Sequence, residues 1–132
     1  MRVRVATPLA AVFLAGILVA CSSPPAAPPP AKPTFVNKVW RVASSSSLEP
    51  GMLYVFLSDG TLVISSPHGT PSLGSWKPSG DGLTMIEEGI AYKVDVLALS
   101  AREFRVMINN PGHAVEIAFA PADDVAPPEA GR

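Results

Sequence analysis

The sequence is short of the residues that usually build disulfides and metal sites. Its 132 residues include one cysteine, Cys21, and two histidines, His68 and His113. One thiol excludes an intramolecular disulfide, and two isolated histidines match no recognised metal-ligand spacing. We interpret both histidines as solvated loop residues, the alternative being that they meet an acid such as Asp59 in the folded chain. The composition therefore predicts neither a metal nor a cofactor.

An excess of positive charge is also missing. The 10 basic and 11 acidic residues form no basic run or stripe, which leaves no electrostatic case for binding nucleic acid. The serines at 44–47 lack the Gly-x-Ser-x-Gly pattern of a catalytic nucleophile. Glu87 and Glu88 are adjacent along an expected strand, so they would point to opposite faces, and we place both in solvent near the strand end. We therefore expect a protein that is not an enzyme.

No apolar run reaches the roughly 20 residues of a membrane-spanning helix. The run from Val5 to Leu18 covers about 14 residues, contains Pro8, and follows the basic segment Met1–Arg4. A basic segment, a short apolar run and then small residues, in this order, are typical of an export signal. The sequence therefore predicts that residues 1–20 are a signal peptide.

The four residues that end this segment, Leu18-Val19-Ala20-Cys21, resemble the bacterial lipobox, at which lipoprotein signal peptidase cuts. The resemblance implies that Cys21 carries a thioether-linked diacylglycerol and usually a third, amide-linked acyl chain such as palmitate. Two or more acyl chains make membrane anchoring stable. The alternative is an ordinary secretory leader with an incidental cysteine. Cleavage before Cys21 would leave 112 residues with 8 basic and 11 acidic side chains, enough for one small domain.

The segment after the cysteine is rich in proline and alanine and has too few large apolar groups to form a core. We interpret residues 21–34 as the lipidated cysteine and a semi-rigid linker. Ser22 stands where enteric-type bacteria place the aspartate that retains a lipoprotein in the inner membrane. In a cell with two membranes, this favours the outer membrane, with the protein facing the periplasm.

The remaining chain has the period of β-strands. Apolar and polar residues alternate in several short segments, and others are rich in residues that favour strands. Asp59-Gly60 and Asp81-Gly82 are typical of tight hairpins, and Pro50-Gly51 and Pro111-Gly112 of type II turns. The segment 46–49 matches a helix capping box, but no apolar helical period follows it, so we assign it to a loop. The expected strands are Val39–Val42, Met52–Leu57, Thr61–Ser65, Gly74–Lys77, Leu83–Glu87, Tyr92–Val96, Phe104–Ile108 and Val115–Phe119.

Eight short strands joined mainly by hairpins predict an all-β fold, an antiparallel meander that closes into a small barrel. A small β-sandwich is the alternative. The alternation assigns one set of side chains to the interior: Trp40, Val42, Tyr54, Phe56, Leu62, Ile64, Trp76, Leu83, Met85, Tyr92, Val94, Val96, Phe104, Val106, Ile108, Val115, Ile117 and Phe119.

A resemblance to a known family rests on motifs spread over residues 38–120. Val39-Trp40, Asp59-Gly60-Thr61-Leu62, Gly74-Ser75-Trp76 and Phe104-Arg105-Val106 together resemble the small lipocalin-like domains of bacterial lipoproteins. The resemblance implies a β-barrel, which we place at residues 35–120. We expect residues 121–132 to be a disordered tail that contributes nothing to the core.

Two functions remain open at this point. The first is a membrane-tethered envelope module, structural or interacting with another envelope protein through an exposed apolar patch around Leu53, Val55 and Leu57. The second is a barrel that binds a small apolar ligand or lipid fragment, with core packing as the alternative role of each lining residue. Aromatic side chains are the candidate ligand contacts, with Trp76 and Tyr54 preferred because each carries a polar group. The full candidate set is Trp40, Tyr54, Phe56, Trp76 and Tyr92.

Overall fold

The computed structural model describes residue 16 and residues 20–29 and 31–129. Most of the expected signal peptide, residues 1–15 and 17–19, lies outside these ranges. The chain divides after residue 30 into two units, and the second of them contains the folded domain. In the first unit, the thiol of Cys21 is free and exposed. Among the described residues, no helix has the length and apolarity needed to span a membrane.

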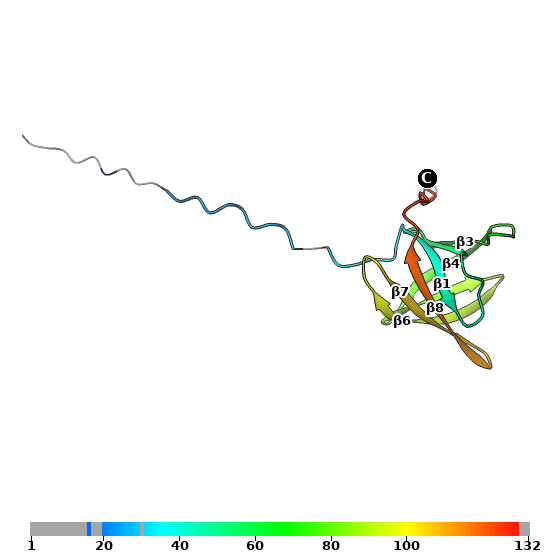
Figure 1. The fold of residues 1–132 in the computed structure, drawn as a ribbon. Coiled ribbons are helices and arrows are strands. Elements are labelled where there is room, and N and C mark those ends of the chain that lie inside the picture. Colours follow the sequence, from blue (N-terminus) through cyan, green and yellow to red (C-terminus); the bar gives the residue numbers. More distant parts are fainter. Residues whose placement is uncertain (1–15, 17–19, 30, 130–132) are drawn as a thin grey trace, which may run out of the picture. The chain divides into compact units, whose positions relative to one another are not determined.

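The domain is an eight-stranded antiparallel barrel (Figure 1). Each strand pairs with the next along the chain, and the last strand pairs with the first, so that the sheet closes on itself. This confirms the expected all-β meander and its closure into a barrel, and it excludes the sandwich. The strands are β1 (Val39–Ser45), β2 (Leu53–Phe56), β3 (Thr61–Ser65), β4 (Ser72–Ser79), β5 (Gly82–Glu87), β6 (Ile90–Leu99), β7 (Phe104–Asn110) and β8 (His113–Pro121).

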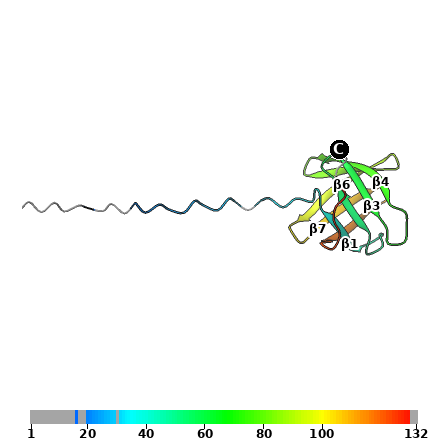
Figure 2. The same cartoon turned by 90° about the horizontal axis from the view of Figure 1, so that it is seen from above.

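The interior of the barrel holds one apolar cluster, and its membership confirms the predicted inward set. Every residue of that set belongs to the cluster, with Trp76, Tyr92 and Val96 at partly buried positions. The strands cross the barrel obliquely, as the turned view in Figure 2 shows. Alternate side chains of each strand therefore meet at the barrel axis, which is why the period of two was sufficient to assign them.

The turns are close to those expected, with one difference. Gly51 and Gly112 have φ angles of 94° and 95°, as the two Pro-Gly turns require. In the turn between β4 and β5, the positive φ belongs to Gly80 and not to the Asp81-Gly82 pair. Gly82 begins β5, and a Cβ atom there would collide with the carbonyl oxygen of Val94 on β6.

The end of the barrel where β1 begins is closed by an aromatic side chain that precedes the first strand. The ring of Phe35 lies 4.8 Å from that of Phe104, 5.2 Å from that of Phe56 and 5.3 Å from that of Trp76, measured between centroids. The Phe35 carbonyl accepts a hydrogen bond from Trp40 Nε1 at 3.0 Å. We call this the closed end. Sequence reasoning placed the domain boundary here but did not assign Phe35 to the core, because a residue ahead of the first strand has no periodic signal.

The segment 122–125, which we call the C-terminal segment, packs on the outside of the barrel. The prediction that the tail contributes nothing to the core is therefore wrong. Ala122 is buried and donates its backbone N–H to the Val39 carbonyl at 2.9 Å. Together with the partly buried Val125, it covers the outward side chains of Val39, Val55 and Leu57. The exposed patch expected around Leu53, Val55 and Leu57 is therefore also wrong. The alternation of apolar and polar residues assigned the strand side chains to the inner or the outer face. It gave no information on whether the C-terminal segment packs against the outer face.

Candidate functional site

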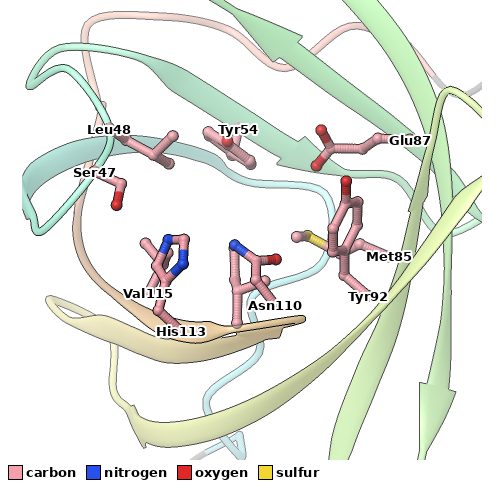
Figure 3. A pocket seen from close by; sticks show the side chains of 10 residues that line it. Ser47, Leu48, Tyr54, Met85, Glu87, Tyr92, Asn110, His113 and Val115 are labelled. Carbon is pink, nitrogen blue, oxygen red and sulfur yellow. The ribbon is translucent and has the colours of Figure 1, made fainter.

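The barrel is hollow at the end opposite to Phe35, which we call the open end. Here the connections β1–β2, β3–β4, β5–β6 and β7–β8 surround a pocket of about 190 Å³ (Figure 3). A cavity of 150 Å³ is known to accommodate benzene, so this pocket has room for a compact molecule of roughly six to nine non-hydrogen atoms. Its lining comes from the β1–β2 connection and five strands: Ser47, Leu48, Tyr54, Met85, Glu87, Tyr92, Ile108, Asn110, His113 and Val115.

The floor of the pocket is apolar. Met85, Ile108 and Val115 are buried members of the core cluster, and Leu48 packs against that cluster from the β1–β2 connection. Leu48 is held in place because the Ser45 hydroxyl accepts a hydrogen bond from its backbone N–H at 3.1 Å. The pocket is therefore the part of the core where the side chains stop short of the barrel end.

A carboxylate lines the pocket beside two phenol groups. The Glu87 side chain points into the pocket near the hydroxyl of Tyr92, with Tyr54 beside it (Figure 3). Burial, and secondarily the neighbouring carboxylate of Glu88, raises the pKa of Glu87 above its ordinary value. Burial likewise raises the pKa of Tyr54, and the charge of Glu87 contributes to that shift. Tyr54 therefore remains a neutral phenol at physiological pH.

The facing wall carries an amide and an imidazole. Asn110 ends β7, and His113 begins β8 opposite to it in the ladder. Both side chains line the pocket, with the Asn110 amide directed toward its centre (Figure 3). The amide oxygen of Asn110 is buried and has no hydrogen-bond partner among the described residues. A buried acceptor without a partner is energetically costly.

The candidate ligand residues divide between the two ends of the barrel. Tyr54 and Tyr92 line the pocket. Trp40 and Phe56 are buried in the aromatic cluster of the closed end. Trp76 also lies there, in ring contact with Phe35 and donating its Nε1–H to the Leu57 carbonyl at 2.8 Å. The two tryptophans therefore do not contact the pocket, although Trp76 was one of the two preferred candidates.

The polar pocket residues Glu87, Asn110 and His113 were not predicted as site residues. Each is in phase with the inward set of its own strand: Glu87 follows Leu83 and Met85, and Asn110 follows Val106 and Ile108. Glu87 is the last residue of β5, as predicted, but the prediction that it is solvated is wrong, since its side chain is half-buried and lines the pocket. Extending the period of two by two residues beyond the terminal apolar residue of each strand, forward on β5 and β7 and backward on β8, identifies all three positions.

The open end is acidic. Its four connections, with the strand residues that flank them, contain Glu49, Glu87 and Glu88, two histidines, and no lysine or arginine. Glu49 lies 3.6 Å from the exposed imidazole of His68, so it has a partner of its own. No ion pair of Glu87 occurs among the described residues. The field at the pocket mouth therefore favours positive charge.

The comparisons with known proteins add no relatives. No protein-family model, no curated protein and no solved structure matches this chain. The geometry also offers no metal centre: in the described part of the chain, no three side chains of the histidine, cysteine, aspartate and glutamate types come together. His68 and His113 lie at the open end, whereas Asp59 lies in the β2–β3 turn at the closed end.

Proposed function

We propose that this protein is a lipid-anchored, non-catalytic binding protein of the bacterial envelope, and that its barrel holds a small ligand at the open end. The observation that carries the proposal is the asymmetry of the barrel. Phe35 and its aromatic partners fill one end, while the other end has a pocket with an apolar floor and a few convergent polar groups. This combination is typical of small-molecule sites.

The alternative, an interaction or structural module, has less support. It depended on an exposed apolar patch, but the C-terminal segment covers Val55 and Leu57. The exposed large apolar side chains of the described residues are Leu73, Ile90 and Leu97, at 73%, 53% and 47%. Individual exposed apolar residues are normal on a protein surface and do not by themselves indicate a docking site.

The anchor is proposed from the lipobox resemblance and Cys21. The mature protein would then be held at a membrane through acyl chains, most consistently the outer membrane on its periplasmic side. The test is metabolic labelling with radioactive palmitate in a bacterial host, comparing the natural chain with Cys21→Ser. We expect label and membrane association in the natural chain and the loss of both in the variant. Equal labelling of the two chains would refute the anchor.

The pocket is tested by mass spectrometry of the full chain, released from detergent under native and denaturing conditions. We expect an additional small mass in the native spectrum alone. His113→Trp should displace this mass, because position 113 lines the pocket mouth and is exposed. The matched control is Asn109→Trp, at an exposed position on the same hairpin that does not line the pocket. An additional mass that survives His113→Trp would place the ligand elsewhere.

A further inference from the structure

We propose that the open-end pocket selects a small organic cation, an amine with a compact apolar body, in preference to a neutral or anionic molecule of the same size. This inference rests on the proposed ligand-binding function and specifies the ligand class. The ammonium group would lie beside Glu87, Tyr54 and Tyr92, and the apolar body would pack on the floor of the pocket.

The first argument is the unpaired carboxylate. Glu87 faces the pocket from β5, and no ion pair or hydrogen bond of its side chain occurs among the described residues. A half-buried carboxylate is stabilised by a cation that enters the same desolvated space, since opposite charges interact more strongly there than in water. A ligand carboxylate at this position would instead be repelled.

The second argument is the chemistry of the surrounding groups. An ammonium group has three donors and no acceptor. The pocket offers it the Glu87 carboxylate, with the hydroxyl-bearing side chains of Tyr54 and Tyr92 beside it. The rings of Tyr54 and Tyr92 add faces that attract cations. A purely apolar ligand would cover the Glu87 carboxylate without providing any donor, which carries a cost.

The third argument is the field around the pocket mouth. Glu88 adds a second carboxylate next to Glu87, and lysine and arginine are absent from all four connections of the open end. His113, on the facing wall, is the one group lining the pocket that can become cationic in this part of the chain. Apart from the two histidines, every ionisable side chain of these four connections is a carboxylate, so the field at the pocket mouth attracts a cationic ligand.

The apolar floor and the volume of the pocket set the size of the ligand body. Met85, Ile108 and Val115 form a floor that matches a ring or a short branched chain, within the volume of about 190 Å³. Benzylammonium, benzyl alcohol and benzoate share one ring of this size and differ in the charge of the head group. They are therefore suitable probes for the proposed selectivity.

The test is an NMR titration of the full-length protein in dodecyl maltoside at pH 7.5, with the methionine methyl groups labelled with ¹³C. Met85 lies in the pocket, whereas Met107 points outward from β7 and is not part of the lining, so it provides the internal reference. Ring currents of a bound benzyl group should shift the Met85 methyl signal in a saturable way. We expect benzylammonium to bind at least tenfold more tightly than benzyl alcohol, and benzoate to cause no saturable shift.

Two variants separate the charge of Glu87 from that of its neighbour. Glu87→Gln should bring benzylammonium and benzyl alcohol to within threefold of each other. Glu88→Gln, which removes the same charge at the exposed adjacent position, should keep the preference for the amine.

Equal or stronger binding of benzyl alcohol by the natural chain would overturn the selection of a cation and leave the ligand-binding function standing. An absence of any saturable Met85 shift with all three probes would overturn both the cation preference and the proposed function. The comparison of the three probes uses the natural chain alone, so the selection of a cation is tested even if Glu87→Gln does not fold.

Discussion

Replacing Phe35 by alanine should open the closed end of the barrel and destabilise the whole domain. Phe35 precedes the first strand, yet its ring contacts the rings of Phe56, Trp76 and Phe104. Its carbonyl also accepts the hydrogen bond from Trp40 Nε1. The substitution removes the ring and leaves an unfilled space between side chains from three strands, while the backbone bond to Trp40 can remain.

The size of the stability loss in Phe35→Ala follows from the burial of the Phe35 ring and its contacts with other rings. Truncating a fully buried phenylalanine to alanine costs about 3–5 kcal/mol. Phe35 is only partly buried, so we expect a loss of about 2–3 kcal/mol in the free energy of unfolding. In a domain of this size, each kcal/mol lowers the Tm by roughly 4–8 °C, so the expected decrease is about 10–20 °C.

Urea denaturation followed by tryptophan fluorescence measures this loss directly. Both tryptophans of the chain, Trp40 and Trp76, contact Phe35, so the emission reports on the closed end as well as on global unfolding. Phe35→Leu should cost less, because it keeps apolar volume, and Lys32→Ala, at an exposed position, should cost nothing measurable. A loss below about 0.5 kcal/mol in Phe35→Ala, with unchanged emission, would refute the role assigned to this ring.

Further predictions concern a glycine, the C-terminal segment and the pocket. Gly82→Ala should lower the free energy of unfolding by about 1–3 kcal/mol, because the added Cβ would collide with the Val94 carbonyl. Gly80→Ala, whose Cβ meets open space but whose φ is positive, should lower it by about 1 kcal/mol in the same urea denaturation. Val125→Asp should lower the free energy of unfolding by about 1–2 kcal/mol and increase the binding of a hydrophobic dye, because it uncovers Val39 and Val55. The control Ala101→Asp, in an exposed turn, should change neither the stability nor the dye binding. Because burial raises the pKa of Glu87 in the folded state, the stability that its protonated form contributes is lost as the pH rises through that pKa. Glu87→Gln should therefore gain Tm relative to the natural chain as the pH rises above 4.5, and a difference that is constant with pH would contradict this.

Most of the fold could be predicted because the interior of a small barrel is marked in the sequence by a regular alternation of apolar and polar residues. Side chains alternate between inside and outside, and the apolar members of each strand identified every buried residue of the core cluster. The strands β6 and β8 nevertheless extend beyond their predicted ends, since the hydrogen-bond ladder continues where the outward residues are no longer distinctive. Contacts made by chain segments outside the strands, Phe35 and the C-terminal segment, follow from three-dimensional proximity and have no periodic signature.

The candidate site was only partly predictable for a related reason. Aromatic residues were chosen as ligand contacts because they are large and partly polar, but size alone does not separate a filled end from a hollow one. Phe56, Trp76 and Phe104 lie at the closed end, where the ring of Phe35 packs against them and fills the barrel. The pocket lies where the strands carry smaller or more polar inward residues, so only Tyr54 and Tyr92 of the candidates contact it.

The polar residues of the pocket are informative because they break the pattern that builds the rest of the barrel. At inward positions that are otherwise apolar, Glu87 and Asn110 place a carboxylate and an amide oxygen that find no partner in the described chain. Burial disfavours the ionised form of Glu87, so the barrel by itself is less stable than one with an apolar residue at this position would be. A ligand cation would reverse this cost, and its binding should therefore raise the Tm of the natural chain more than that of Glu87→Gln. The same residue would then lower the stability of the ligand-free barrel and determine which ligand restores it.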